Sequence, residues 1–234
     1  MHFDKVGFIG LGLIGGSIAR KMKENNPKVS IIATAGHQQT IDDAFGLGLI
    51  DNNELLELNS FKDCDVIFLC APVNKNIEYL TQLKDIIKDD CIITDVGSTK
   101  TQIHEKVIEL GLEHNFIGGH PMTGSEKTGI LNSDKQLLEN AYYIITPTAA
   151  TTEENLNNFR QFVLSLGSIA LILDYRDHDH ATAAISHLPH MIAYSLVNLI
   201  EHIDSEKETM KTIAAGGFRD VVMSIKGELS KSTN

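Results

Sequence analysis

The chain has 234 residues, 42% of them hydrophobic and 22% charged, which is the balance of a folded globular protein with its own core. Its formal net charge of −11 at pH 7 argues against nucleic acid or an anionic membrane as the main partner, because both need a basic surface. The cysteines Cys64, Cys70 and Cys91 form no CxxC pair, so we expect reduced thiols and a cytoplasmic location.

The N-terminal segment has an early acid and an apolar run broken by glycines, unlike the basic-then-apolar layout of a signal peptide. We see no stretch with the roughly 18 apolar residues that a membrane-spanning helix needs. We therefore expect neither export nor a membrane anchor.

Short β-rich apolar segments alternate with helix-like segments through the first part of the chain. Strands are expected near residues 5–10, 29–34, 65–73, 91–97, 115–119, 141–147 and 168–174. Helices are expected near residues 17–24, 40–46, 74–87, 100–110 and 153–166. Strands that are apolar throughout and alternate with helices predict a parallel sheet covered on both faces. The sequence thus predicts an α/β class protein with a doubly wound Rossmann-type domain over residues 1–174.

After Asp174 the pattern changes to apolar residues at helical spacing, with no further strand. Residues 175–234 are expected to form a short all-helical segment. Pro189 lies inside this pattern and should kink the helix, because proline lacks the N–H that would bond the carbonyl four residues earlier.

A glycine fingerprint, GxGxxG, lies between the first expected strand and the helix that begins near Ile14. It consists of Gly10, Gly12 and Gly15, and neighbouring Gly16 adds nothing specific. In such a motif one glycine makes the tight turn, one lets a pyrophosphate approach the backbone and one allows close helix–strand packing. The helix N-terminus, at Leu13 and Ile14, adds free N–H groups and partial positive charge. We therefore predict dinucleotide binding here, against a purely structural glycine turn.

The fingerprint normally includes an acid about 20 residues further on, which holds the adenosine ribose hydroxyls. The second expected strand ends instead in ATAGHQQT, without an acid. With no carboxylate to repel a 2′-phosphate, Thr34, His37 and Gln38 leave room for NADP, although an acid-free loop also accepts NAD and its backbone alone can bind the ribose. The sequence leans slightly towards NADP over NAD as the cofactor.

Two further loops follow apolar strands, at the edge of the sheet where open α/β domains bind ligands. The first contains the cofactor-binding candidates Cys70, Ala71 and Pro72, and the second contains Asp95, Gly97, Ser98, Thr99 and Lys100. We expect Asp95, Ser98 and Lys100 to face the nicotinamide side. Ser98 or Thr99 also fits the N-cap of the helix that starts near Lys100.

Five segments in this order resemble the prephenate dehydrogenase family of tyrosine biosynthesis, which includes arogenate-using relatives. They are GFIGLGLIGGSIA, DVGSTK, GGHPMTGSEKTG, SHLPH and AAGGFRD, and the likeness runs from about Val6 to Asp220. HPMTGSE and SHLPH are its specific parts, since many dehydrogenases share GxGxxG. The resemblance implies NAD(P)-dependent oxidative decarboxylation of a small molecule, prephenate or arogenate, by a homodimer if the helical segment suffices.

The resemblance also implies roles for residues that the fingerprint does not reach. His120 would accept the proton of the substrate's ring hydroxyl as hydride leaves, which suits a neutral imidazole, and Ser98 would contact the same hydroxyl. The substrate-binding residues implied are Thr123, Gly124, Ser125, Glu126 and His190. Glu126 resembles the family's gating acid, and the glycines around His120 are expected to let substrate come close.

The histidines at 178, 180, 187 and 190, with nearby Asp174, Asp177 and Asp179, also permit a metal site. Only His187 and His190 share a helical face and there is no HExxH-type set, so helix-capping aspartates, a substrate-pocket His190 and a structural His187 are the preferred interpretation.

The chain departs from the family pattern after AAGGFRD. Relatives continue with a threonine and then an arginine that grips the substrate's side-chain carboxylate, where this chain has Val222 and Met223. Nearby Arg219 and Lys226 are poor replacements. We expect a C-terminally shortened enzyme, and two alternatives stay open: a binding-only NAD(P) remnant without turnover, and another small-substrate NAD(P) enzyme of the β-hydroxyacid or pyrroline-carboxylate type.

Overall fold

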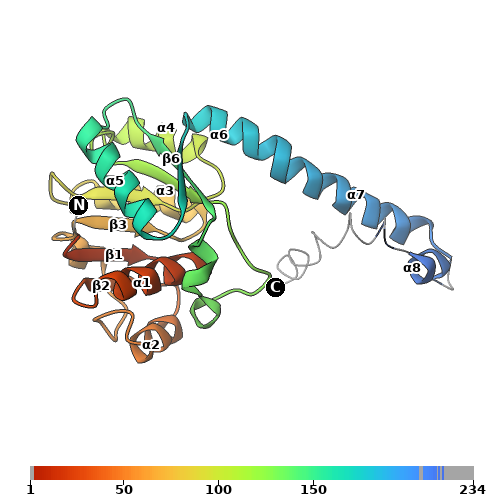
Figure 1. Ribbon diagram of the computed structural model, residues 1–234, viewed down its shortest axis with the longest axis horizontal. Helices are drawn as coiled ribbons and strands as arrows, with labels where there is room; N and C mark the ends of the chain where they lie inside the picture. Colours follow the sequence, from red (N-terminus) through yellow and green to blue (C-terminus); the bar gives the residue numbers. More distant parts are fainter. Residues whose placement is uncertain (1–2, 206–207, 215, 217, 219–234) are drawn as a thin grey trace. The chain divides into compact units, whose positions relative to one another are not determined.

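A parallel sheet forms the first half of the chain in the computed structural model, which describes residues 3–205, 208–214, 216 and 218. It contains β1 (Lys5–Ile9), β2 (Ser30–Thr34), β3 (Val66–Leu69) and β4 (Ile92–Asp95), in the order β2-β1-β3-β4. All of its neighbouring strands pair parallel (Figure 1). The predicted α/β class with a Rossmann-type sheet is confirmed.

A second group of strands extends the sheet: β5 (Ile117–Pro121), β6 (Tyr142–Pro147) and β7 (Ile169–Ile172). A parallel bridge between Ile93 and Phe116 connects β4 with the start of β5, and Ile93 N donates to Asn115 O at 2.6 Å. The strands β5 and β6 are antiparallel, which corrects the expectation of parallel strands throughout. Two short 3-10 segments, η2 (Ile130–Asn132) and η3 (Lys135–Leu138), lie between them and no α-helix does in this described segment, whereas parallel neighbours are usually connected by an α-helix.

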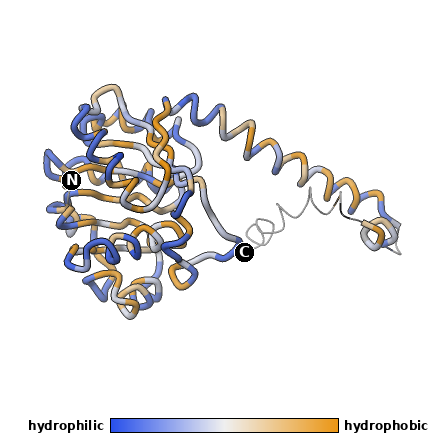
Figure 2. The backbone as a smooth tube through the Cα atoms, in the orientation of Figure 1, coloured by the Kyte–Doolittle hydropathy of each residue, from blue (hydrophilic) through white to orange (hydrophobic). Residues whose placement is uncertain are grey.

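Two apolar cores lie on opposite faces of the sheet. One contains buried residues of α1 (Leu13–Asn25), α2 (Gln38–Gly46) and α5 (Glu153–Ser165), and the other those of α3 (Val73–Leu83) and α4 (Thr101–Leu110). Successive residues of one strand alternate between the cores: Phe8 belongs to the first and Ile9 to the second. Apolar colouring accordingly follows the central strands in Figure 2. The strands therefore have to be apolar throughout, which is the pattern that predicted them.

Gly16 has a structural role that its sequence position did not reveal. A Cβ there would lie 2.8 Å from Ser133 Cβ, so the missing side chain lets α1 pack directly on the η2 segment. The contact is completed by Arg20 Nε, which donates to Ser133 Oγ at 2.7 Å. The connection between β5 and β6 is thereby fixed to the helix that follows the glycine fingerprint.

The chain divides into two compact units, Met1–Asp179 and His180–Asn234, which we describe separately. The helix Tyr175–Ile203 consists of α6 (Tyr175–Thr182), a π-helical turn over Ala183–His187, and α7 (Leu188–Ile203); α8 (Thr209–Ile213) follows. The π turn ends at His187, directly before α7, so Pro189 lies in the first turn of α7, where its missing N–H is tolerated. The helix accommodates the proline by changing from α-helical to π-helical hydrogen bonds over Ala183–His187.

The helix Tyr175–Ile203 is 29 residues long, and its length and composition would allow it to cross a membrane, although our reading of the sequence found no such stretch. Core helices of soluble proteins have the same length and composition. Exposed apolar residues recur on this helix at helical spacing: Ile185, Leu188, Ile192, Leu199 and Ile203. Figure 2 shows apolar and polar colours mixed along α7.

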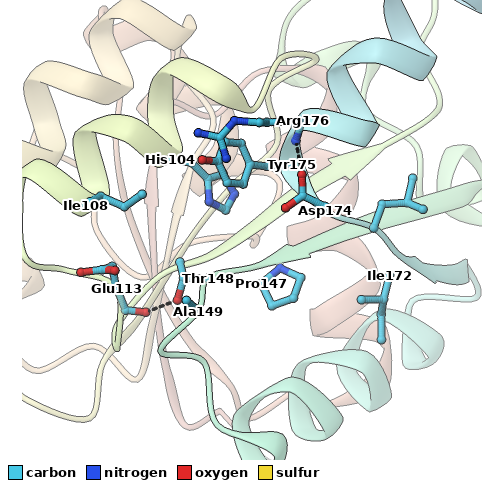
Figure 3. A pocket seen from close by; sticks show the side chains of 11 residues that line it. His104, Ile108, Glu113, Pro147, Thr148, Ala149, Ile172, Asp174, Tyr175 and Arg176 are labelled. Carbon is cyan, nitrogen blue, oxygen red and sulfur yellow. Dashed lines mark hydrogen bonds between the residues drawn. The ribbon is translucent and has the colours of Figure 1, made fainter.

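His104 on α4 is buried between aromatic rings and is held neutral. Its ring stacks on Tyr175 with centroids 4.4 Å apart, and its Nε2 lies 2.9 Å from Thr146 Oγ1. Burial, with a smaller effect of Lys100, lowers the pKa of His104 from 6.5 to about 4. The two stacked rings form one wall of a hollow of about 550 Å³ (Figure 3), whose lining contains none of the site residues predicted from the sequence.

We predict that His104 makes the protein lose stability in mild acid. Its pKa is depressed in the folded state, so the unfolded chain binds the extra proton as the pH falls from 6.5 towards 4, and the free energy of unfolding drops by up to about 3 kcal/mol over that range. Urea unfolding of His104→Phe between pH 7 and 4 should show a flatter slope, with His178 supplying the remainder. Exposed His114→Phe is the matched control; a slope equal to wild type in His104→Phe would contradict the prediction.

Candidate functional site

The glycine fingerprint forms an open cradle at the end of β1. Gly10 has φ +87°, and a Cβ there would lie 2.7 Å from Ala71 N, so only glycine fits this turn. A Cβ at Gly15 would lie 3.1 Å from Cys70 Sγ, which shows how closely α1 packs on the end of β3. Around the corresponding point at Gly12 there is nothing within 4 Å. The fingerprint therefore leaves open space where a pyrophosphate would approach the backbone.

The N-terminus of α1 faces this cradle with its backbone donors. Its N-cap is Gly12, without a side-chain cap, and Leu13 and Ile14 are the first residues of the helix. The N–H groups of a first helical turn, together with the helix dipole, form an anion site. The cradle therefore fits a dinucleotide, on the open space at Gly12 and the uncapped helix start.

The loop of Cys70, Ala71 and Pro72 is held by a residue that the sequence analysis missed. Asn76 is fully buried, its Oδ1 accepts from Ala71 N and its Nδ2 donates to Leu69 O, both at 3.2 Å. Burial also raises the pKa of the Cys70 thiol, which excludes a thiolate nucleophile at neutral pH. An asparagine in the first turn of a helix is the sequence signal from which such hydrogen bonds to the preceding loop could have been predicted.

Of the three residues expected at the ribose, two remain candidates. Thr34 ends β2, and its carbonyl accepts from Gly10 N at 2.8 Å, which ties this strand end to the fingerprint. His37 is exposed at the N-cap of α2. Gln38 instead holds the following loop, since its Nε2 donates to Asn53 O at 2.8 Å and its Oε1 accepts from Leu55 N at 3.1 Å. The Gln38 amide is thus already bonded within the protein, and its contact with the cofactor stays a prediction.

Asp95 and Lys100 do not line the crevice, contrary to the sequence analysis. Both side chains are fully buried and form an ion pair. Asp95 Oδ2 also accepts from Gly97 N at 2.9 Å, and Oδ1 accepts from Gly119 N at 3.3 Å. Burial lowers the pKa of Lys100, and the Asp95 carboxylate opposes that shift. The pair holds the loop after β4 from the protein interior, and Ser98 is the exposed residue of that loop.

The N-terminus of α4 is capped from far along the chain. The sequence predicted Ser98 or Thr99 as the N-cap, and this is wrong. The N-cap is Lys100, whose side chain makes no capping hydrogen bond. Asp179 on α6 accepts from Lys100 N at 2.7 Å and from Thr101 N at 2.8 Å. Asp174 likewise accepts from Arg176 N at 2.8 Å at the start of α6, so Asp174 and Asp179 bond the N–H groups of helix starts.

His120 lies on β5 and is half-buried. Its Nδ1 is 2.8 Å from His178 Nε2, and His178 Nδ1 is 2.8 Å from Asp179 Oδ1. Burial lowers the pKa of His178, against the opposing hydrogen bond from Asp179. Burial alone would raise the pKa of Asp179, but hydrogen bonds from Thr101, His178 and Lys100 lower it overall. The sequence analysis named His178 and Asp179 without linking them to His120.

The glycines before His120 serve packing and not substrate access, which corrects the sequence interpretation. Both belong to β5 and are buried. A Cβ at Gly118 would lie 2.8 Å from His104 Nε2, and one at Gly119 would lie 2.8 Å from both Asp95 O and Tyr143 Oη. They let β5 pass closely over its neighbours. The open part of the segment begins after Pro121, where Gly124, Ser125 and Glu126 are exposed and Thr123 is half-buried.

The remaining predicted substrate residues lie in the second unit or outside the described residues. His190 is half-buried on α7, and its Nδ1 lies 2.6 Å from Ser186 O. His187 is exposed. The positions Arg219, Val222, Met223 and Lys226, on which the expected loss of the carboxylate-binding arginine rests, lie outside the described residues.

Two family profiles match the chain. The profile described as prephenate dehydrogenase, nucleotide-binding domain, matches residues 18–171, and the profile described as prephenate dehydrogenase, dimerization domain, matches residues 174–229. The prephenate dehydrogenase of Lactococcus lactis subsp. cremoris is 38% identical over 220 residues, which cover 93% of this chain and 60% of the relative. The chain thus spans about three-fifths of that relative's length.

Solved structures agree with these matches. A crystal structure of prephenate dehydrogenase from Aquifex aeolicus, in complex with hydroxyphenyl propionate and NAD+, matches with a TM-score of 0.87 and 28% identity, over 99% of this chain and 79% of that one. The Synechocystis arogenate dehydrogenase matches with a TM-score of 0.83 and 32% identity, over 98% of this chain and 81% of that one.

We predict that breaking the buried pair is far more harmful than breaking an exposed one. Lys100→Met leaves the Asp95 carboxylate buried without its cation and should lower the free energy of unfolding by about 3 to 5 kcal/mol. Adding Asp95→Asn to this variant should restore part of the lost free energy of unfolding, because it removes the unpaired charge while the amide oxygen still accepts an N–H. Lys106→Met, which removes the exposed pair with Glu109, is the control and should change stability by less than about 1 kcal/mol. Equal losses in the two single variants, measured by urea unfolding, would refute the bracing role.

Proposed function

The chain belongs to the prephenate dehydrogenase family, and we propose that it catalyses the NAD(P)-dependent oxidative decarboxylation of prephenate or arogenate in tyrosine biosynthesis. The observation that carries the proposal is the position of His120. The strands β1, β3, β4 and β5 run parallel, so Gly10, Cys70, Ser98 and His120 follow or end their strands at the same edge of the sheet. A proton acceptor thus shares one edge with the dinucleotide cradle.

The cofactor cradle consists of Gly10, Gly12, Leu13, Ile14 and Gly15, with Cys70, Ala71, Pro72 and Gly97 beside the nicotinamide half and Thr34 and His37 at the ribose. When bound, a nicotinamide dinucleotide supplies the hydride acceptor. Asp95 contributes by holding Gly97 N, without facing the cofactor. The acid-free end of β2 and the exposed His37 favour NADP slightly, whereas the Aquifex relative was crystallised with NAD+.

The chain's own groups have a limited chemical task. His120 accepts the proton from the ring hydroxyl, and Ser98 donates to or accepts from the same oxygen. The ring carboxylate leaves as carbon dioxide and the ring becomes aromatic, which drives the step forward. Thr123, Gly124, Ser125 and Glu126, on the loop after β5, bind the substrate, and His190 is a further substrate-binding candidate. These residues accelerate the reaction by holding the substrate in the reacting geometry relative to His120 and the cofactor.

We assign residues 1–174 to the dinucleotide-binding domain and residues 175–234 to the helical domain, which we propose forms a homodimer. The dimerization profile over residues 174–229 and the exposed apolar residues of the Tyr175–Ile203 helix support that assembly. Reduced, buried thiols and a biosynthetic role favour a cytoplasmic location. The family membership leaves a β-hydroxyacid or pyrroline-carboxylate activity without support.

We predict that the purified chain reduces NAD+ or NADP+ with prephenate or arogenate, and that His120→Asn lowers kcat by about 100- to 10,000-fold, the range for losing a general base. Steady-state absorbance at the reduced nicotinamide band, over the four substrate and cofactor combinations, measures both. Cofactor affinity should stay unchanged in His120→Asn, since the cradle lies on other strands. Turnover in none of the four combinations would exclude the activity and leave the binding-only alternative.

We predict a concentration-dependent dimer through the apolar face of α7. Sedimentation equilibrium should give the mass of two chains, and the double variant Ile192→Asp with Leu199→Asp should shift the equilibrium to the monomer, because two charges would be buried unpaired at the interface. Glu201→Gln changes a charge on the opposite side of the same helix and serves as the control. A wild-type chain that stays monomeric at every concentration tested would contradict the prediction.

A further inference from the structure

Three side chains form a continuous line of hydrogen bonds behind the proposed proton acceptor. His120 on β5 contacts His178 on α6 between Nδ1 and Nε2 at 2.8 Å, and His178 contacts Asp179 between Nδ1 and Oδ1, also at 2.8 Å. The two imidazole planes are inclined at 72°, so the contact is edge-on along the nitrogen lone pair and not a stacking contact. The line begins at the Asp179 carboxylate and ends at the half-buried imidazole of His120.

The far end of this line is fixed by the protein backbone. Asp179 accepts from Lys100 N at 2.7 Å and from Thr101 N at 2.8 Å, so both of its oxygens point at the start of α4. The helix dipole and these donors favour the ionised carboxylate, in agreement with the lowered pKa of Asp179. An ionised carboxylate only accepts hydrogen bonds. His178 Nδ1 must therefore be the donor in its contact with Asp179.

The remaining protons follow from the chemistry of neutral imidazole, which has one N–H donor and one acceptor nitrogen. With its proton on Nδ1, His178 presents Nε2 as an acceptor. His120 Nδ1 must then donate to it, and the second nitrogen of a neutral His120, Nε2, carries the lone pair. A doubly protonated His178 would reverse this order, but burial lowers the pKa of His178 and keeps it neutral near pH 7.

We propose that His178 and Asp179 are positioning residues that hold His120 in the tautomer whose Nε2 accepts the substrate's hydroxyl proton, an inference that rests on the proposed function. In the step itself the O–H bond breaks, the proton moves to His120 Nε2, and the Nδ1–H bond to His178 stays intact. No proton has to travel along the line. The negative charge of Asp179 then faces the imidazolium that forms, through one neutral ring.

Several titratable groups surround His178 and influence its charge. The groups that face His178 are Asp179 on its own helix, Lys100 and His104 at α4, Asp95 on β4, and His120 on β5. Lys100 disfavours a charged His178, and the two aspartates favour it. Because Lys100 is paired with Asp95, the carboxylate that contacts the histidine directly is Asp179. Replacing this single carboxylate is therefore the sharpest way to disturb the line.

The test is Asp179→Asn in the full chain. The amide keeps one oxygen, and its N–H faces either Thr101 N or the shared position of Lys100 N and His178 Nδ1. Where the N–H faces His178, we expect His178 to turn its lone pair to Nδ1 and His120 to carry its proton on Nε2; in both orientations the negative charge is lost. We expect kcat to fall by at least about 10-fold and by no more than in His120→Asn, with KM changed by less than about threefold, because the base is present but in the wrong tautomer. The acid limb of the pH–rate profile should move to lower pH, because the imidazolium loses its counter-charge.

Nitrogen NMR of histidine-labelled protein reads the tautomer directly, without turnover. We expect wild-type His120 to show a protonated Nδ1 and an unprotonated Nε2, and Asp179→Asn to reverse or mix the two signals. Asp177→Asn, an exposed aspartate with the same charge change on the same helix, should match wild type in all readouts. Asp179→Glu retains a carboxylate and should recover part of the kcat.

The outcomes separate the two proposals. If wild-type His120 carries its proton on Nε2, or if Asp179→Asn leaves both the tautomer and kcat unchanged, the positioning role is wrong even in an active enzyme. If the tautomer is as stated but no substrate is turned over, the proposed function fails and the line of hydrogen bonds is structural only. A loss of melting temperature in Asp179→Asn without a change of tautomer also marks Asp179 as a helix cap alone and overturns the inference.

Discussion

The buried Asp95 carboxylate is the constraint on which the crevice edge depends. It ends β4 and accepts from three directions: the Lys100 ammonium, Gly97 N in the loop that carries Ser98, and Gly119 N on β5. An ionised carboxylate in the interior needs such partners, because an unpaired buried charge is costly by several kcal/mol. The backbone around Asp95 therefore has little freedom, and β5 must come close enough for Gly119 N to reach it. That approach leaves no space for a Cβ at Gly119, and His120 is the next residue.

Lys100 connects this carboxylate to the second acid of the site. Its ammonium binds Asp95 and its backbone N–H binds Asp179, so one residue at the start of α4 receives a carboxylate from either side. The helix N-terminus offsets part of the second negative charge, which a single ammonium could not do alone. The result joins β4, α4, β5 and α6 around His120 and His178. Rigid elements hold all the groups behind the proposed proton acceptor, as precise placement of a reacting group requires.

The sequence predicted the strands, most helices and the roles of the fingerprint glycines, because these follow from local periodicity and from turn geometry. It did not predict which polar residues turn inward. Asp95 ends an apolar strand and Ser98 lies three residues beyond it, and contacts with Lys100 and with Gly119, 24 residues away, hold the Asp95 carboxylate in the interior. Likewise, the local rule for helix caps selected Ser98 or Thr99, whereas the cap comes from Asp179, 78 residues beyond Thr101. Long-range partners of this kind leave no periodic trace in one sequence.

The site combines a fixed half and an open half, and their difference has a chemical reason. His120 is on a strand whose two glycines pack closely against His104 and Tyr143. Its position is therefore fixed by the sheet as well as by the contact with His178. The polar residues that follow, from Gly124 to Glu126, are exposed on a loop. A proton acceptor must keep one nitrogen directed at one atom, whereas groups that surround a substrate must let it enter and its product leave. The change from strand to loop at Pro121 therefore divides the segment between the proton acceptor and the groups that surround the substrate.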